Sequence, residues 1–273
     1  MKVEVYGGHH SPWVQAVLLG LREKGIDHSL RALPPYATFK KWGLLMPAVS
    51  IDNQDWQVES SDILANIGFD PISEEDLAAI RMAWQGVLHR PDNPPRFFAG
   101  FSRAGDKSKS LFKRSCVNFI RGFIPAYMFT LINTVKFTQK PKDPENFGDQ
   151  FLYWEGALQA SSGPFVDGEK PGIRDMLLFG LVQCHSSIPV PPLKALRQDP
   201  RLQSLRHWIG VMQERYDGYP LMFSANYFQP EVAAPEPADG LQRSFFYAGL
   251  LGTVLAMPLT LPLMFFLMRK VPR

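Results

Sequence analysis

The fold is decided near the N-terminus by residues 3–25, which read VEVYGGHHSPWVQAVLLGLREKG. The apolar run Val3–Tyr6 and the two glycines after it predict a strand followed by a turn. Ser11-Pro12 is typical of a helix start, and apolar side chains then recur at the spacing of one helical face. Lys24-Gly25 gives this helix a basic last turn and a C-cap glycine. A strand therefore leads through a turn into a half-buried helix.

Working outward, the pattern continues as short strands and helices up to residue 70. The predicted order is β-α-β-α-β-β-α, which favours an α/β sheet with helices on its faces. We therefore assign residues 1–70 to one domain. After the first helix its predicted elements are a strand over 26–33, a short helix over 39–45, strands over 47–51 and 56–58, and a helix from 59 to 67.

From residue 73 the character of the chain changes to long apolar-periodic stretches with little strand signal. Such a pattern predicts an all-helical domain, which we place over residues 73–228. Proline-rich joints separate its predicted helices, which lie over 73–89, 110–137, 148–160, 172–184 and 202–216.

The C-terminal part reads as a Pro-rich linker over 229–243 and a membrane anchor over 244–268. Residues 245–268 carry no charge, and as a helix they would be about 36 Å long, enough to cross a hydrocarbon core of about 30 Å. The expected fold class is thus an α/β domain, an all-α domain and one transmembrane helix. Pro258 and Pro262 leave a kinked or re-entrant hairpin as the alternative.

The net charge and cysteine content limit the binding partners and the cell compartment that we expect for this protein. The formal net charge of +3 over 273 residues is too small to favour a nucleic-acid partner. Cys116 and Cys184 have neither disulfide-framework nor metal spacing, suit a reducing compartment, and are expected to be buried. Residues 1–12 hold no apolar core of a secretory signal. We expect a single-pass C-terminal anchor with the folded part facing the cytoplasm, although the basic residues after the anchor favour a cytoplasmic tail, which a hairpin would also satisfy.

A second basic feature is the segment 96–121, in which seven Lys and Arg residues stand against one Asp. Phenylalanines are interspersed among these charges. The segment would either face anionic lipid headgroups or form a solvated loop and helix end.

Ser11 is the first candidate for chemistry. At the start of a helix, unpaired N–H groups and the helix dipole favour a negative charge, so an anion such as a thiolate would be stabilised there. The serine hydroxyl would donate a hydrogen bond to that thiolate. The alternative is an ordinary N-cap serine. His9-His10 precedes it, but adjacent side chains diverge and no third ligand is evident, so we predict no metal site.

Two further features would complete a binding site. A cis proline at Met46-Pro47, at the head of a strand, would expose the backbone of Met46 to a ligand, whereas a trans proline at a strand start is the alternative. Glu59-Ser60 begins a second helix, where the serine and nearby amides would hold a carboxylate and Glu59 an ammonium. Simple capping is the alternative. Together these residues predict a site for a thiolate, an extended backbone and the two ends of an amino acid.

These segments resemble a known family. Ser11-Pro12-Trp13, with Arg22-Glu23-Lys24-Gly25-Ile26, resembles the first helix of soluble glutathione transferases that have a serine or cysteine before a proline. Met46-Pro47-Ala48-Val49 and Glu59-Ser60-Ser61-Asp62-Ile63 resemble their cis-proline strand and glutathione clamp. Gly163-Pro164-Phe165-Val166-Asp167-Gly168, with Ile173-Arg174-Asp175, resembles the capping segment of their helical domain. The resemblance spans about residues 1–228.

The resemblance implies a thioredoxin-like domain followed by an all-helical domain, with glutathione as co-substrate. It gives Ser11 the catalytic role of hydrogen bonding the glutathione sulfur. Met46, Pro47, Glu59 and Ser60 would bind glutathione. An apolar second substrate would lie between the domains, and membrane lipid would contact residues 244–268. The family also implies a possible homodimer.

The chain departs from the family pattern in three places. One is Ser11, because a cysteine there would favour glutathione-disulfide exchange, whereas serine favours thiolate activation and conjugation. The lysine that often holds the glycyl carboxylate is replaced by Gly43-Leu44-Leu45, with Lys40 or Lys41 as weak substitutes. Gly172 stands where the capping box normally has serine or threonine, which bears on folding rather than on chemistry. These departures keep a rival hypothesis open, namely a non-catalytic scaffold or sensor of the same fold that is tethered to a membrane, as metaxins are.

Overall fold

The protein is described by a computed structural model that covers residues 2–8, 11–31, 33–89, 109–139, 146–185, 191–223 and 238–268. Its N-terminal domain is built on a four-stranded sheet with the order β2-β1-β3-β4. β1 pairs in parallel with β2 and antiparallel with β3, which pairs antiparallel with β4. The strands are β1 (Val3–Tyr6), β2 (His28–Arg31), β3 (Ala48–Ile51) and β4 (Gln57–Val58).

Helices cover both faces of this sheet. Val3, Val5 and Val49 join the main hydrophobic core with residues of α1 (Pro12–Glu23) and α3 (Ser60–Asn66). Because side chains alternate along a strand, Tyr6 and Ala48 point to the other face. There they pack with Trp42 of α2 (Tyr36–Trp42). This βαβ-αββα arrangement is thioredoxin-like, and it confirms the α/β domain expected from the sequence.

The C-terminal part is helical, as predicted. Its described elements are α4 (Glu74–His89), α6 (Leu111–Gln139), the short 3-10 helix η1 (Asp149–Phe151), α7 (Leu152–Ala160), α8 (Ile173–His185), α9 (Pro191–Gln198) and α10 (Gln203–Arg215). α9 was not expected, because the sequence places a proline-rich joint there. Pro191-Pro192 instead begins the helix, where a missing N–H costs nothing.

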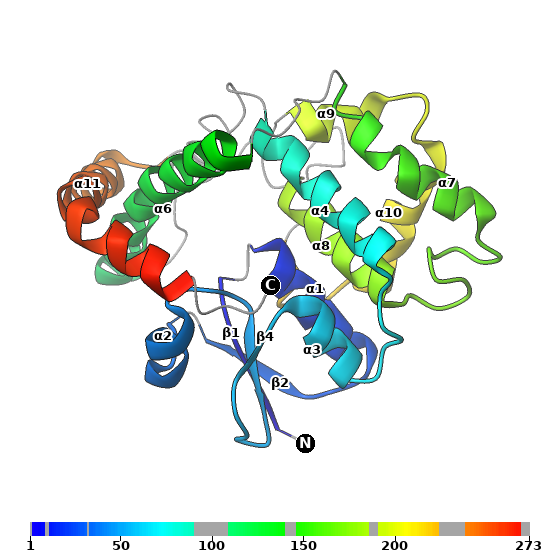
Figure 1. Cartoon of the computed structure of the whole chain (residues 1–273), viewed down its shortest axis with the longest axis horizontal. Coiled ribbons are helices and arrows are strands. Elements are labelled where there is room, and N and C mark those ends of the chain that lie inside the picture. The colour runs from blue at the N-terminus through cyan, green and yellow to red at the C-terminus, as the bar shows by residue number, and fades with distance from the viewer. Residues whose placement is uncertain are drawn as a thin grey trace.

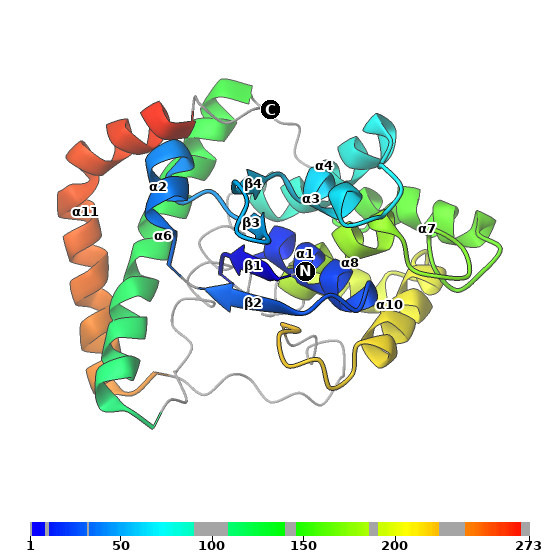
Figure 2. The same cartoon turned by 90° about the horizontal axis from the view of Figure 1, so that it is seen from below.

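Helix α8 joins the two domains. It packs along α1 behind the sheet (Figures 1 and 2), and Gly180 permits the close approach because a Cβ there would collide with the carbonyl oxygen of Pro12. The main core continues without interruption from β1 to α10 and includes Phe179, Trp154 and Trp208. The thioredoxin-like and helical domains therefore share one hydrophobic core.

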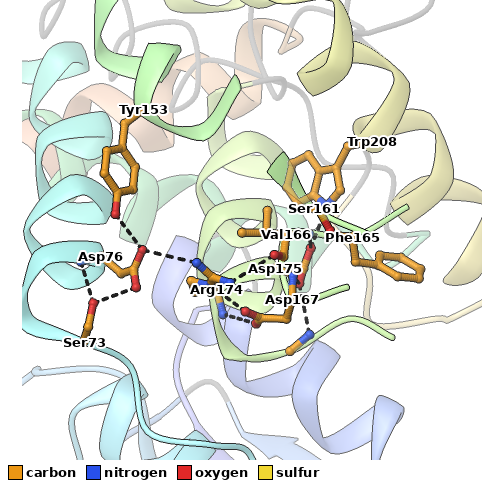
Figure 3. Close-up of polar contacts among 11 residues, drawn as sticks. Ser73, Asp76, Tyr153, Ser161, Phe165, Val166, Asp167, Arg174, Asp175 and Trp208 are labelled. Carbon is orange, nitrogen blue, oxygen red and sulfur yellow. Dashed lines mark hydrogen bonds and ion pairs between the residues drawn. The ribbon is translucent and has the colours of Figure 1, made fainter. Parts of the chain in front are cut away.

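Hydrogen bonds to the carboxylate of Asp175 fix the start of α8, and we call this group of contacts the polar lock. The carboxylate of Asp175 is fully buried and accepts hydrogen bonds from the backbone N–H groups of Val166, Asp167 and Gly172 at 2.8, 3.1 and 3.0 Å. The indole N–H of Trp208 in α10 donates a fourth at 2.7 Å (Figure 3). Asp175 thus reaches back to the N-cap position as in a capping box, even though the cap is glycine.

Neighbouring groups extend this lock to α4 and α7. Arg174 donates to Asp167 at 2.5 Å and lies 3.6 Å from a carboxylate oxygen of Asp76. Asp76 accepts a hydrogen bond from Tyr153 at 2.9 Å, and its own N–H donates to the hydroxyl of Ser73, which caps α4 (Figure 3).

The last helix, α11 (Gly240–Met268), lies beside α6 at one edge of the molecule (Figures 1 and 2). Within it Gly240–Leu263 is long and apolar enough to cross a membrane by length and composition, and 17 % of its most apolar window is buried. Residues 240–243 were expected in the linker but belong to this helix. The rest of that linker up to residue 237 lies outside the described residues.

Candidate functional site

The register of the sheet brings the predicted site residues to one end of it. Tyr6 pairs with Ala48, so the chain beyond Tyr6 runs beside Met46-Pro47. Ala48 pairs with Val58 in the antiparallel pair of β3 and β4. Pro47, which precedes Ala48, and Glu59, which follows Val58, therefore lie beside each other at the end of these strands. The predicted site residues therefore all lie at the same end of the central strands, namely Ser11, Met46-Pro47 and Glu59-Ser60.

Direct contacts tighten this arrangement around Met46. The N–H of Gly8 lies 3.2 Å from the sulfur of Met46, and the N–H of Ser11 donates to the carbonyl of Gly8 at 2.9 Å. A Cβ at Gly7 would collide with Val14 and would stand 3.3 Å from the Cβ of Met46. Glycine at position 7 therefore lets α1 and Met46 approach. As predicted, the Met46–Pro47 peptide bond is cis.

Ser11 is the N-cap residue of α1. Its backbone is extended, with φ −70° and ψ 131°, and Pro12 occupies the first turn. The residue is buried, and its hydroxyl makes no capping hydrogen bond to the helix backbone. A serine that caps its helix would use this hydroxyl on the N–H of the second or third helical residue. The geometry therefore leaves the oxygen at the helix start able to bond to a ligand.

Glu59 is held in an unusual backbone conformation at the start of α3. Its φ of 72° and ψ of 110° place a non-glycine residue in a region that costs about 1–3 kcal/mol and that recurs at ligand clamps. Ser60, the first residue of α3, is buried beside it. The surrounding structure holds Glu59 in this conformation at the same sheet edge as Ser11.

The other sequence candidates divide into those the structure places and those it does not. Lys40 and Lys41 are exposed in the last turn of α2, and the amine of Lys41 lies 4.3 Å from the ring centre of Trp42. His9-His10 lies outside the described residues. No group of three His, Cys, Asp or Glu side chains suited to a metal occurs among the described residues. Cys116 was expected to be buried and is exposed on α6.

An aromatic contact across the domain boundary was missed at the level of sequence. Trp13, two residues after Ser11, meets Trp84 of α4 edge to face at 6.4 Å between ring centres. Both side chains are partly exposed. The Trp13-Trp84 pair forms a partly exposed apolar surface at the first turn of α1, the helix whose N-cap is Ser11. Only Trp13 carried a signal in the sequence, through its place after Ser11-Pro12.

Two polar links hold the domains together on either side of α1. The buried side chain of Gln15 donates to the carbonyl of Leu221 at 3.0 Å and accepts from the N–H of Phe223 at 2.9 Å. At the other end of α1, Glu23 accepts from Arg215 at 2.5 and 2.8 Å and from Tyr216 at 2.9 Å.

Hydrogen bonding and burial have opposite effects on a buried carboxyl group, and the balance differs between Glu23 and Asp175. Burial opposes the ionisation of Glu23, but the hydrogen bonds from Arg215 and Tyr216 outweigh it and lower the pKa. For Asp175 burial dominates over its hydrogen bonds and raises the pKa to about 6. Glu23 lies in the contact between the end of α1 and the end of α10, whereas Asp175 lies within the helical domain at the start of α8.

No protein-family model and no curated protein matches the chain. Solved structures similar to it are consistently glutathione S-transferases of several classes. The tau-class enzyme of mango is 15 % identical, with a TM-score of 0.47 over 83 % of this chain and 94 % of that one. Glutathione S-transferase I of maize, solved with an atrazine–glutathione conjugate, is 12 % identical, with a TM-score of 0.47 over 84 % and 99 %.

A theta-class enzyme of Xanthomonas axonopodis, solved with glutathione bound, is 14 % identical, with a TM-score of 0.42 over 81 % of this chain and 94 % of that one. At these identities the likeness concerns the fold alone. Each of these structures is similar to the chain only distantly, with a TM-score below 0.5.

Proposed function

We propose that the protein is a glutathione transferase-like enzyme held at a membrane, in which Ser11 activates the thiol of glutathione for conjugation to, or reduction of, an apolar electrophile. The observation that carries the proposal is the sheet register, which places Ser11, Met46-Pro47 and Glu59-Ser60 at one edge. Glutathione needs such a site, since it presents a thiol between two peptide-like arms with charged ends.

Activation would take place at the start of α1. The unpaired N–H groups of the first turn and the helix dipole favour an anion. The hydroxyl of Ser11 would donate a hydrogen bond to the sulfur. Both effects stabilise the thiolate, which is the nucleophilic form, and so lower the thiol pKa from its ordinary value of about 8.5.

Binding would rest on the clamp and the strand beside it. Glu59 would take the ammonium of the γ-glutamyl arm, Ser60 its carboxylate, and the backbone of Met46 the cysteinyl part. The conformation of Glu59, with φ 72°, supports a positioning role because such strain is retained where the surrounding structure imposes it.

The apolar electrophile would contact the Trp13-Trp84 pair. Both rings are partly exposed, and Trp13 follows Ser11 by two residues. Tryptophan offers a large apolar area to a ligand. We further propose that α11 brings the enzyme to a membrane in which such substrates dissolve, that the folded domains face the cytoplasm, and that the protein can dimerise.

The test is glutathione binding by calorimetry with the full-length protein in detergent. Ser11→Ala should leave binding nearly intact while the ultraviolet absorbance of the bound thiolate shifts to higher pH. Glu59→Ala should weaken binding about tenfold or more, since a hydrogen bond to a charged group contributes about 1.5–3 kcal/mol. Ser29→Ala, which removes an exposed serine of β2, is the matched control and should change neither measurement.

A second arm tests the electrophile. With glutathione saturating, Trp84→Ala should raise the KM for an apolar electrophile several-fold and leave glutathione affinity unchanged, and Trp84→Phe should restore much of the loss. A well-folded protein that fails to bind millimolar glutathione would refute the enzyme and leave the membrane-tethered scaffold.

A further inference from the structure

The helices α6 and α11 pack mainly against each other and lie outside the main hydrophobic core, with a further contact between α11 and α2. The main hydrophobic core contains no residue of either helix, although it runs from Val3 to Tyr219. Among described elements, the contact between α6 and α11 is the most extensive, and both views show the two helices side by side at one edge (Figures 1 and 2). We call these two helices the α6–α11 pair.

The pair is parallel, and its contacts are those of helices that associate in lipid. Arg114 faces Asp239 at 3.9 Å, and the buried Asn118 donates to Gln242 at 2.9 Å. Further along, Tyr127 donates to Thr260. Small residues that permit close approach, together with interhelical polar contacts, are typical of membrane helix pairs.

The small residues lie in the middle of the contact. A Cβ at Gly122 would collide with the backbone of Phe246 and Leu250, and a Cβ at Gly249 with the carbonyl of Phe119. The two helices therefore touch backbone to backbone over this stretch. α11 follows the direction of α6 from Asp239 to Thr260, and whatever orientation α6 takes, α11 shares.

Helix α6 cannot cross a membrane in a single pass. Residues up to Ala83, before it, and from Phe151, after it, belong to the same core, so both lie on one side of any bilayer. A return crossing has no segment to use, because residues 90–108 carry six charges and residues 140–145 are too few. α6 therefore does not cross a bilayer, and α11, which runs parallel to it, shares that orientation.

The outward surface of the pair is apolar. Along α11 Leu251, Leu255, Leu259 and Leu263 recur every fourth residue and are 61, 72, 81 and 50 % exposed. On α6 Phe112 and Ile120 are exposed as well. A helix without charge on any side over residues 245–268 has no polar face to turn to water, as it would need in a soluble dimer. The sides of α11 that do not pack on α6 are therefore suited to contact lipid.

We propose that the α6–α11 pair embeds in one leaflet of the bilayer with both helices in the membrane plane, so that α6 is a second membrane-contacting element and α11 does not cross as a single-pass anchor. Most backbone polar groups of both helices are paired within the helices, as lipid requires, whereas Pro125, Pro258 and Pro262 each remove one helical hydrogen bond. Lys113, which is exposed in the first turn of α6, would then reach lipid phosphates. This inference does not depend on the glutathione site.

Depth measurements with spin labels test it in the full-length protein. Single cysteines replace Leu251, Leu255, Leu259, Leu263 or Ile120 in a Cys116→Ser, Cys184→Ser background, and the labelled proteins are placed in vesicles of phosphatidylcholine and phosphatidylglycerol. Oxygen and a water-soluble nickel complex report depth. We expect the four α11 labels at similar depth and the Ile120 label in lipid. Met82→Cys, at an exposed position of α4, is the control and should stay in water.

Three outcomes would overturn the proposal. A depth change of about 18 Å from Leu251 to Leu263, with the Ile120 label in water, would mean a crossing helix. Labels of α11 in water would mean that no bilayer binds. Labels buried without vesicles in a protein of doubled mass would mean that a second copy covers the pair. Glutathione binding on the same samples shows separately whether the proposed function holds.

Discussion

Two pairs of helices in this molecule pack through glycine, and their surroundings differ. α8 approaches α1 at Gly180, inside a core that the sheet and the other helices complete. α11 approaches α6 at Gly122 and Gly249, but exposed leucines and phenylalanines cover the outside of that pair. Close packing between helices is thus the same device in both, whereas the medium around them differs. The first pair contributes to the stability of the folded domains, and the second presents an apolar surface.

The largest effect should come from the polar lock at the start of α8. Asp175→Ala leaves four buried or half-buried N–H donors without their acceptor, and we expect a loss of about 3–5 kcal/mol in the free energy of unfolding. Urea unfolding followed by tryptophan fluorescence measures it, because all six tryptophans lie outside the α6–α11 pair. Asp167→Ala, whose partner Arg174 is partly exposed, is the control and should cost about 1 kcal/mol.

The same carboxyl gives the lock a pH dependence. Burial raises the folded-state pKa of Asp175 to about 6, above its unfolded value of about 3.9. Its contribution to stability is therefore complete below about pH 4 and is lost as the pH rises through 6. Relative to Asp175→Asn, the wild-type protein should be more stable by a margin that shrinks between pH 4 and 6. A margin that grows over this range would contradict the assigned direction.

A matched pair of glycine substitutions tests whether the α1–α8 and α6–α11 contacts contribute differently to stability. Gly180→Ala places a methyl group against the backbone of Pro12, and overpacking of this kind costs about 1–3 kcal/mol. Gly249→Ala makes an equivalent collision with Phe119, yet it should change core unfolding by about 0.5 kcal/mol or less, since the pair lies outside the core. Equal losses in the tryptophan-detected transition would show that the two regions unfold as one.

The smallest effect should come from the exposed side of the domain interface. Glu23→Gln weakens the contact with Arg215 and Tyr216, and because the Arg215 side chain is 39 % exposed we expect a loss of about 1 kcal/mol or less at pH 7. The folded-state pKa of Glu23 is lowered, so its contribution is present above the unfolded pKa of about 4.3 and is lost as the pH falls through the folded value. Unfolding at pH 7 and at low pH should show the difference between variant and wild type disappear in acid.

Local patterns in the sequence predicted much of the candidate site. Ser11-Pro12 marked a helix start, and Glu59-Ser60-Ser61 marked another, because capping depends on neighbours in the chain. The cis bond at Met46-Pro47 was expected from the resemblance and occurs. The strained φ of Glu59 and the meeting of Trp13 with Trp84 were not predictable, since each depends on residues brought together by the fold. The roles of these side chains in glutathione binding stay predictions.

The amino-acid sequence by itself determined the order of the elements in the sheet-containing part, the change from that part to the helical part, and the uncharged C-terminal helix. These follow from periodicity, capping and charge, which act over a few residues. The tertiary structure decided that α8 would lie against α1, that Asp175 would be buried beneath four donors, and that α11 would pair with α6. Those outcomes depend on which apolar faces meet and on how closely backbones approach, and contacts between residues far apart in the chain leave no local signal in it.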